Sequence, residues 1–441
     1  MERTLVSETI NKVGKKIKIE GYVHVVRSHG KIAFADITDR SGVIQVVGDS
    51  IIADLRPQYA VEIEGTINSR PERMFNDKIE TGKVELLAEK VTVLSKSDEM
   101  PFDMGAEVLN LELPTLLDYR TLTLRHSRIK DIFKVQAAVL SGFRKASEDL
   151  GCIEITVPTI SASSTEGGAE VFTVDYYGHK AFMTQSPQLY KQMMVPSLER
   201  VYTIAKAYRA EPSVTTRHLS EATQMDCEIG FVNFEELLDA VEYVGLETLK
   251  YVEEKCGNIL ENYKVSKLQI SKEIPRLKMR EAQEIIFERT GVDHRTEKDL
   301  DPEDEKEICK WALEEKGSDL VTITHYPTKK RAFYTKPDPS DPEFSLSYDL
   351  LFRGLEIMSG SQRINNYSEL ITAIKDRGME PKNFEMYLQA FKYGMPSEGG
   401  FSFGLERITM KLLGLSNVRE ASLFPRDMER VDFRMPAVEK K

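Results

Sequence analysis

Near its C-terminal end the chain reads Gly399-Gly400-Phe401-Ser402-Phe403-Gly404-Leu405-Glu406-Arg407. The residues from Leu405 to Leu413 then predict a helix that ends at Gly414. A glycine-rich turn that enters a helix lets the backbone approach a phosphate closely, because N–H groups and the positive helix end face the anion. The same letters also spell Gly-x-Ser-x-Gly, the nucleophile turn of serine hydrolases. Two different chemistries are therefore open at this stretch.

The order of residues along the chain argues against the hydrolase. A nucleophile turn at Ser402 needs an acid and then a histidine further along the chain, and the last histidine, His325, lies upstream. A catalytic triad of another order stays geometrically open. The chain has no Gly-x-x-x-x-Gly-Lys-Ser/Thr phosphate loop and no strand-placed Gly-x-Gly-x-x-Gly, so two other common nucleotide motifs are absent.

The bulk composition is that of an ordinary soluble protein. The 441 residues, 41% hydrophobic and 30% charged, predict two or three domains. No apolar run reaches the ~20 residues that a membrane span needs, and no secretory signal is visible, so we expect a cytoplasmic protein without membrane contact. The four cysteines form no Cys-x-x-Cys pair, which favours reduced thiols. The net charge of −11 argues only weakly against a nucleic-acid partner.

The first hundred residues predict a small β-barrel. Five segments carry strand-like alternation and β-branched residues, and turn residues separate them: 17–26, 32–38, 43–47, 60–67 and 84–93. Five strands in ~80 residues, with one long connection near Arg56, are typical of an OB fold. Another small barrel without a ligand is the alternative. We assign residues 1–97 to this domain.

Residues 98–120 predict a linker, and 121–441 a second, α+β domain. A helix capped by Ser127 runs to Gly151, and a short strand at 152–157 follows it. Asn233 and Glu236 form a capping box for a long helix, and Asp301 caps a helix that Gly317 closes. Strands that mostly follow one another, with helices grouped between them, indicate an antiparallel sheet.

Charged residues of the second domain suit a nucleotide and an amino acid. Arg209 and Arg217 flank a polar loop, and arginine offers bidentate donors to phosphate, while Glu211 can accept from an exocyclic amine. A surface ion-pair hairpin is the alternative. Glu356 and Ser359 offer hard oxygen ligands suited to Mg²⁺.

A further set of charges suits a carboxylate. In the run Gln185–Lys191, Lys191 lies one helical turn after the proline that starts a helix, and Arg363 lies just behind a predicted strand. If these two cations share one pocket, they would bind a carboxylate group. Asp226 and Glu228 are spaced to share one face of a strand. Paired acids on a strand are usually solvated, but the apolar run 222–231 around them favours a pocket.

Together these motifs resemble the class II aminoacyl-tRNA synthetases, and among them the aspartyl-tRNA synthetases, over nearly the whole chain. The three signature motifs of the class match residues at about 139–160 (motif 1), 201–231 (motif 2) and 399–414 (motif 3). Residues 163–170, the run Gln-Ser-Pro-Gln-Leu-Tyr-Lys-Gln at 185–192 and Leu-Phe-Pro-Arg-Asp at 423–427 are similar to aspartyl signatures.

The resemblance implies roles for individual residues. Arg209 and Arg407 would be catalytic, on the α-phosphate and the nucleotide. The residues implied in ATP binding are Arg209, Ala210, Glu211, Arg217, His218, Leu219, Glu356, Gly404, Leu405, Glu406 and Arg407. Those implied around aspartate are Glu170, Gln188, Leu189, Tyr190, Lys191, Arg209, Asp226, Ser359 and Arg363. Glu356 and Ser359 would hold Mg²⁺.

The implied reaction is the activation of L-aspartate by ATP and its transfer to tRNA(Asp). Asparaginyl and lysyl enzymes share the architecture, so specificity has to come from single residues. Lys191 favours aspartate, as does Asp226, where asparaginyl enzymes tend to carry Glu. An asparaginyl-type enzyme, or a paralogue that only binds nucleic acid or makes a free amino-acid product, is the competing interpretation. Motif 1 implies a homodimer.

The barrel would bind the anticodon through His24, Arg27, Phe34 and Gln45, with Phe34 stacking on a base. Plain core packing is the alternative for Phe34. His24 matches enzymes that also accept tRNA(Asn), which gives a hypothesis of relaxed tRNA specificity; a surface histidine without a role is its alternative.

Two residues depart from the family pattern. Ser402 stands where motif 3 usually has a glycine, which would leave the backbone less freedom. Glu398 stands where the family often has a histidine beside the nucleotide, and so would add negative charge near the phosphates. Both departures bear on the affinity for ATP.

Overall fold

The computed structural model describes residues 1–77, 79–163, 171–210, 215–270 and 273–436. The chain divides into two compact units, Met1–Glu112 and Leu113–Lys441, which are described separately below. The boundary lies inside the segment 98–120 that the sequence marks as a linker. Among the residues described, none of the helices is both long and apolar enough to span a membrane.

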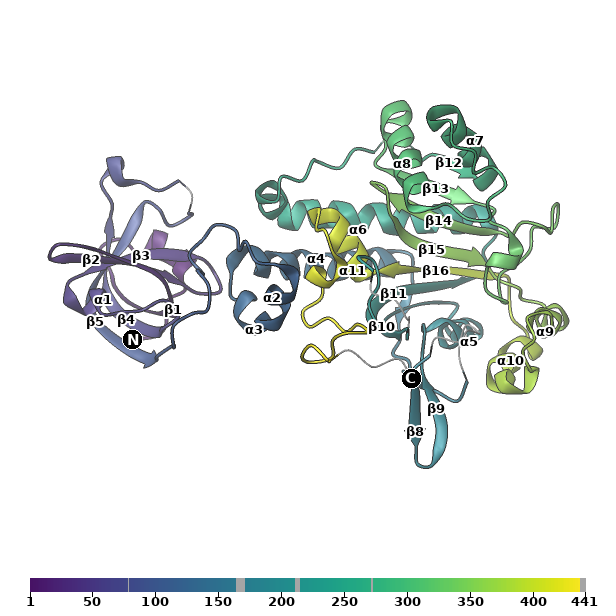
Figure 1. Cartoon of the computed structure of the whole chain (residues 1–441), viewed down its shortest axis with the longest axis horizontal. Helices are drawn as coiled ribbons and strands as arrows, with labels where there is room; N and C mark the ends of the chain where they lie inside the picture. The colour runs from purple at the N-terminus through teal and green to yellow at the C-terminus, as the bar shows by residue number, and fades with distance from the viewer. Residues whose placement is uncertain (78, 164–170, 211–214, 271–272, 437–441) are drawn as a thin grey trace. The chain divides into compact units, whose positions relative to one another are not determined.

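The first unit is a closed barrel with the strand order β1-β2-β3-β5-β4 (Figure 1). Its strands are β1 (Lys16–His29), β2 (Ile32–Thr38), β3 (Val43–Gly48), β4 (Ala60–Ser69) and β5 (Val84–Ser95), with the short helix α1 (Ser50–Ala53) between β3 and β4. Alternation fills the core: Ala33, Ala35 and Ile37 are buried, whereas Phe34 and Asp36 between them are not. The five predicted strands and the OB fold are confirmed.

The second unit is built on an eight-stranded sheet with the order β12-β13-β14-β15-β16-β11-β10-β6. Its strands are β6 (Ile153–Glu154), β10 (Arg200–Tyr208), β11 (Glu221–Gly230), β12 (Arg276–Lys278), β13 (Leu320–Thr324), β14 (Ser347–Phe352), β15 (Glu356–Gln362) and β16 (Glu398–Gly404). All neighbours are antiparallel except β12–β13 and β10–β6, which are parallel. A separate small sheet holds β7 (Ile160–Ser161), β8 (Thr173–Tyr176) and β9 (His179–Met183). The predicted α+β architecture is confirmed.

Two long helices, α4 (Ser127–Asp149) and α6 (Phe234–Asn262), cover one face of the large sheet (Figure 1). Phe143 of α4 packs edge-on against Tyr202 and Phe403, and a side chain at Gly245 of α6 would collide with Leu350. The other helices are α2 (Leu113–Asp118), α3 (Arg120–Thr123), α5 (Gln188–Leu198), α7 (Met279–Thr290), α8 (Pro302–Lys316), α9 (Tyr367–Asp376), α10 (Glu385–Lys392) and α11 (Leu405–Leu413). Because α4 and α6 fill one face, polar side chains gather on the opposite face.

The glycine-rich stretch is a central strand and not a turn. Gly399 and Gly400 lie in β16 between β11 and β15, and the chain passes directly from Gly404 into α11. Neither glycine has a positive φ. A Cβ at Gly400 would lie 2.2 Å from the Cys227 carbonyl oxygen and from Glu228 Oε2, so glycine is needed here for close approach. The helix over Leu405–Leu413 with Gly414 at its end is confirmed.

Other boundaries differ from the prediction in smaller ways. The segment expected as a linker contains α2, whose Leu116 and Leu117 are buried, and ends where α3 begins. The strand expected at 152–157 is reduced to the two residues of β6. His126 and not Ser127 occupies the cap position of α4. The capping box of Asn233 and Glu236, and the Asp301 cap of α8, are confirmed.

Candidate active site

A cavity of about 360 Å³ opens on the sheet face that α4 and α6 leave free. Strands β10, β11, β15 and β16 and the first turn of α11 all contribute to its wall. Its lining includes five arginines, Arg209, Arg217, Arg331, Arg363 and Arg407. So many positive side chains around one concave site are suited to an anionic ligand of high charge.

Register across three strands places the polar side chains of the cavity floor. Asp226 of β11 pairs with Ser402 of β16, and Ser402 pairs with Ser359 of β15. All three residues line the cavity. Ser402 Oγ donates a hydrogen bond to Asp226 Oδ1 at 2.7 Å. Ser402 has no positive φ, so the conformational penalty expected for a serine at this position is absent; the residue is a hydrogen-bond donor within a strand.

Lys191 of α5 is fully buried next to Asp226 of this floor. Its Nζ lies 2.8 Å from Asp226 Oδ2 and 3.1 Å from Glu228 Oε2. It also donates to the backbone carbonyls of Phe401 at 3.1 Å and Cys227 at 3.3 Å. The lysine itself is not among the lining residues, but Asp226, with which it is paired, lines the cavity.

Arg363, just after β15, presents the second buried cation. Its Nε and Nη2 donate to the two oxygens of Glu228 at 2.7 and 3.2 Å, and Nη1 donates to Ser361 Oγ at 2.6 Å. Nη2 also reaches Gln188 Oε1 at 3.4 Å, and the guanidinium lies over the Tyr334 ring. The bidentate pair with Glu228 fixes the plane of the guanidinium at the cavity wall.

The two acids that hold these cations have opposite pKa shifts. Burial on its own would raise the pKa of Glu228, but Arg363 and Lys191 outweigh burial and lower this pKa to about 2. Burial dominates for Asp226 and raises its pKa, although Lys191 and Ser402 both act against that rise. Glu228 is therefore the fixed anion of the site, and Asp226 depends on its hydrogen bonds to remain ionised.

The opposite end of the cavity carries the arginines that are suited to binding phosphate. Arg407 Nη1 in the first turn of α11 lies 3.6 Å from Glu356 Oε2. Arg217 Nη1 lies 3.4 Å from Glu305 Oε2, and His218 Nδ1 is 2.7 Å from Thr215 Oγ1. Arg209, at the end of β10, also lines the cavity. Guanidinium groups held by single, partly exposed acids can turn to phosphate oxygens when a nucleotide arrives.

A group of acids between these arginines has the chemistry of a divalent-cation site. Burial raises the pKa of Glu356, and the neighbouring Asp349 adds to the rise. Burial also raises the pKa of Glu305 to about 7, with Glu356 as the largest charged contributor. Asp349 Oδ1 is buried without a hydrogen-bond partner among the described residues. A cation would relieve this mutual repulsion, so the donor set fits Mg²⁺.

The sequence analysis did not identify three residues at this end of the cavity: Arg331, Asp349 and Glu305. Arg331 Nη2 donates to Asp349 Oδ2 at 2.8 Å and Nη1 to Ser359 Oγ at 3.3 Å. Arg331 follows two lysines in a connection, and Asp349 lies within an apolar strand, so neither position stands out in the sequence. A charged residue inside an apolar strand is the one signal that could have pointed to Asp349.

The remaining expected site residues fall into three groups. Gln188, Leu219, Gly404 and Glu406 line the cavity, although both Glu406 oxygens accept from the backbone N–H of Thr223 at 3.0 and 3.2 Å. The residues that do not line it are Ala210, Leu189, Tyr190 and Leu405. Leu189 packs in an apolar cluster with Phe391 and Leu370. Glu170 and Glu211 lie outside the described residues.

The expectation that Glu398 lies beside the nucleotide is wrong. This residue does not lie beside the arginines of the nucleotide end but is fully buried against α5, where its Oε1 accepts from Gln192 Nε2 at 2.7 Å. Burial raises the pKa of Glu398 well above its usual value, and the neighbouring Glu228 adds to this rise. The residue therefore adds no negative charge near phosphates.

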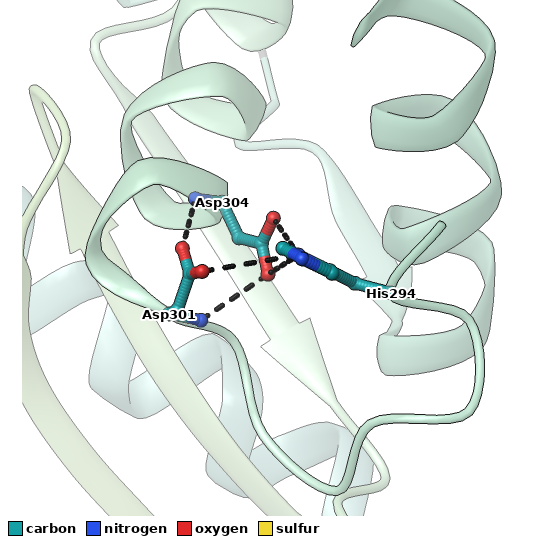
Figure 2. A group of neighbouring side chains, drawn as sticks. All are labelled: His294, Asp301 and Asp304. Atoms are coloured by element: carbon teal, nitrogen blue, oxygen red, sulfur yellow. Dashed lines mark hydrogen bonds and ion pairs between the residues drawn. The ribbon is translucent and has the colours of Figure 1, made fainter. Parts of the chain in front are cut away.

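Outside the cavity, His294, Asp301 and Asp304 gather at the start of α8 (Figure 2). Asp301 Oδ1 caps the helix by accepting from the backbone N–H groups of Glu303 and Asp304. His294 Nδ1 lies 3.0 Å from Asp304 Oδ1 (Figure 2). These bonds account for all three side chains as a helix cap with a histidine attached to it.

On the barrel, Arg27 pairs with Phe34 across β1 and β2, and Asp36 pairs with Gln45 across β2 and β3. Phe34 is absent from the buried core, so plain core packing is not its role. Arg27 Nη2 contacts both oxygens of Asp36 at 2.9 Å. His24 lies apart, at an irregularity of β1, in a cavity that residues 97–105 help to line.

Comparison with known proteins identifies the family to which this architecture belongs. Residues 112–428 match the family described as tRNA synthetases class II (D, K and N), and residues 17–94 match the OB-fold nucleic acid binding domain. The chain therefore belongs to the class II tRNA synthetases.

Individual relatives show which members of this family the chain resembles. The chain is 40% identical to the aspartate–tRNA(Asp/Asn) ligase of Thermus thermophilus, over 97% of this chain and 99% of the relative. It is 38% identical to the aspartate–tRNA(Asp) ligase of Pyrococcus abyssi, over 97% and 98%. Among solved structures, the asparaginyl-tRNA synthetase of Pyrococcus horikoshii with asparaginyl-adenylate matches with a TM-score of 0.89 at 28% identity, covering 98% of this chain and 99% of that chain.

Proposed function

We propose that the protein is an aspartate–tRNA ligase, which activates L-aspartate with ATP and transfers it to tRNA(Asp). The observation that carries this proposal is the pair of cations at one end of the cavity. Arg363 at the wall and the buried Lys191 are both held by Glu228, and Lys191 also by Asp226. A site built on two fixed cations favours a carboxylate over an amide of the same shape.

The reaction needs no protein nucleophile. The α-carboxylate of aspartate attacks the α-phosphorus of ATP and expels pyrophosphate, and the aspartyl-adenylate is then attacked by the terminal ribose of the tRNA. Arg209 and Arg407 face the accumulating negative charge, so positioning and electrostatics supply the catalysis. Ser402, the candidate hydrolase nucleophile, has its hydroxyl bonded to Asp226, and described residues offer it no histidine partner.

At the amino-acid end of the cavity, different side chains contact the carboxylate and the ammonium of aspartate. Arg363 and the charge of Lys191 hold the side-chain carboxylate, Asp226 faces the ammonium, and Gln188 completes the wall. Glu170, by resemblance, joins this set. At the other end Arg217 reaches the γ-phosphate, and Glu211, by resemblance, contacts adenine.

Glu356 and Ser359 would hold Mg²⁺, with Asp349 next to them. A bound divalent cation supplies charge neutralisation of the phosphate oxygens. The contribution of this chain is to hold oxygen donors at that point, where Asp349 is ion-paired with Arg331 and Glu356 with Arg407.

The asparaginyl reaction is the second candidate, because a structural neighbour is named as an asparaginyl enzyme. The higher identity to aspartate ligases and the two buried cations favour aspartate. We further propose that the protein works in the cytoplasm as a homodimer, and that the barrel face with Arg27, Phe34 and Gln45 binds the anticodon.

The test is aminoacylation of tRNA(Asp) and tRNA(Asn) transcripts with labelled aspartate and with labelled asparagine. Aspartyl-tRNA(Asp) is the expected product, and aspartyl-tRNA(Asn) in addition would establish the relaxed specificity for which His24 is the candidate residue. Product with asparagine alone would overturn the proposal in favour of the second candidate.

A further inference from the structure

Glu398, the first residue of β16, is a buried acid that the mechanism above does not use. It is 0% exposed. Its Oε1 accepts from Gln192 Nε2 at 2.7 Å, and its Oε2 is buried without a hydrogen-bond partner of acceptable geometry among the described residues. An ionised carboxylate in such a place has to be paired with a cation, or it takes up a proton.

In the part of the chain that the structure describes, the two cations near Glu398 are both paired with other acids. The positive charge of Arg363 acts on Glu398, but the guanidinium is committed to Glu228 through two hydrogen bonds. Lys191 is likewise committed to Asp226 and Glu228. The other charged neighbour of Glu398 is Glu228 itself, an acid whose approach is repulsive unless one of the two carries a proton.

The uncharged groups around Glu398 form one hydrogen-bond chain. Gln192 of α5 donates to Glu398 and accepts from Gln188 Nε2 at 2.9 Å and from the Tyr387 hydroxyl of α10 at 3.1 Å. Gln188 in turn accepts from Arg363. Tyr334 lies beneath the guanidinium of Arg363. Glu398 therefore ties α5 and β16 to the residues that orient Arg363.

Charge balance decides which form of Glu398 the site can use. The two buried cations, Lys191 and Arg363, are matched by the two acids Asp226 and Glu228. A third ionised acid would leave the cluster negative before any substrate arrives, and it would repel a carboxylate. An acid that carries a proton would add no charge and would have a proton to donate to Glu228.

We propose that Glu398, as an uncharged carboxylic acid, is a positioning residue for the recognition of the aspartate side chain. It holds Gln192 with one oxygen, directs its proton towards Glu228, and so fixes Arg363 through both. The inference rests on the proposed aspartate activation. Burial and the repulsion from Glu228, which together raise the pKa of Glu398 well above its usual value, agree with the uncharged form.

The proposal predicts a pH effect that is specific for this residue. When Glu398 ionises at alkaline pH, the Michaelis constant for aspartate rises, because a third buried negative charge then faces the substrate carboxylate. A glutamine at position 398 reproduces the uncharged acid: its Oε1 accepts from Gln192, and its Nε2 donates to Glu228. Glu398→Gln therefore loses this alkaline rise.

The experiment is aspartate-dependent ATP–pyrophosphate exchange from neutral to alkaline pH in wild type, Glu398→Gln, Glu398→Ala and Glu385→Gln. Glu385 is an exposed acid at the start of α10 and serves as the matched control. Glu398→Gln is expected to keep the neutral-pH KM for aspartate within about twofold, and Glu398→Ala to raise it about tenfold or more with a smaller change in kcat. Glu385→Gln is expected to behave as wild type.

Three results would overturn the proposal: loss in Glu398→Gln as large as in Glu398→Ala, an unchanged alkaline rise in Glu398→Gln, or an unchanged KM in Glu398→Ala. If the alanine variant does not fold, the glutamine variant alone decides between the ionised and uncharged forms. An inactive wild type would contradict the proposed function, whereas an active wild type with any of these three variant results contradicts only the role of Glu398.

Discussion

Ser402 Oγ on β16 donates to Asp226 Oδ1 on β11 at 2.7 Å, and the other oxygen of Asp226 lies 2.8 Å from Lys191 Nζ. Asp226 is thus held between a hydroxyl and an ammonium. Because burial raises the pKa of this carboxyl, each of the two partners helps to keep it ionised.

Ser402→Ala should therefore weaken aspartate binding without touching ATP. Loss of one hydrogen bond to a charged group should cost about 1 kcal/mol, or about a fivefold rise in the KM for aspartate. Exchange kinetics with each substrate varied in turn measure this effect. Ser368→Ala, an exposed serine on α9, is the control. An increase in the KM for ATP alone would show that Ser402 serves the nucleotide.

Arg363→Lys keeps the charge but removes the planar fork that pairs with Glu228. With Glu228 partly unpaired inside the protein, we expect a loss of about 2–3 kcal/mol, which corresponds to a rise of about a hundredfold in the KM for aspartate. Arg353→Lys, which removes the fork of another arginine paired with an acid, Asp319, tests whether any such change has the same effect. Equal losses in both variants would mean that stability and not recognition is affected.

Arg407→Ala should lower the rate of adenylate formation about 10²–10³-fold, because a charge that faces the developing negative oxygens is lost. Its partner Glu356 would also lose the contact with a cation at 3.6 Å. Single-turnover adenylate formation measures the step directly. A change confined to the KM for ATP would assign Arg407 to ground-state binding instead.

Phe34→Ala should remove about 1–3 kcal/mol of stacking on a tRNA base. The KM for tRNA should therefore rise, and aspartate-dependent exchange should stay unchanged. Phe75→Ala, which removes an exposed aromatic ring of the barrel unit, is the control. If both variants reduce tRNA charging equally, the face around Arg27 and Phe34 has no special role.

Stability of the second unit should depend on pH through His294. Its hydrogen bond with Asp304 raises the pKa of the imidazole, so the folded state binds a proton more tightly than the unfolded chain. The stabilisation is complete below the unfolded pKa and is lost as the pH rises through the raised folded pKa. Thermal unfolding should show a larger decrease across this range in wild type than in His294→Asn, with the exposed His179→Asn as control. Parallel curves for wild type and His294→Asn would contradict it.

Local signals were sufficient for much of the fold. Alternation located the five barrel strands, and caps at Asn233 and Asp301 located two helices, because both signals depend on neighbours in sequence. The strand β16 was mistaken for a turn, since Gly400 is required by the close approach of Cys227 and Glu228, which belong to another strand. Such a requirement has no local signature.

The candidate site likewise contains some residues that local motifs revealed and others that only the folded structure revealed. Lys191, Asp226 and Arg363 were recognised from motifs, and the structure brings them together. Glu398 was expected at the nucleotide end, but β16 runs from the amino-acid end towards α11, and Glu398 is its first residue. Arg331 comes from a connection without periodicity, so only the folded chain reveals its contact with Asp349.

The central claim is that this cavity activates aspartate. The most direct measurement is ATP–pyrophosphate exchange with aspartate, with asparagine and with neither, in wild type and in Arg209→Ala. Exchange in wild type with aspartate, little with asparagine, and its loss in a folded Arg209→Ala variant is the predicted result. Exchange that depends on asparagine and not on aspartate, or full activity in Arg209→Ala, would contradict the account.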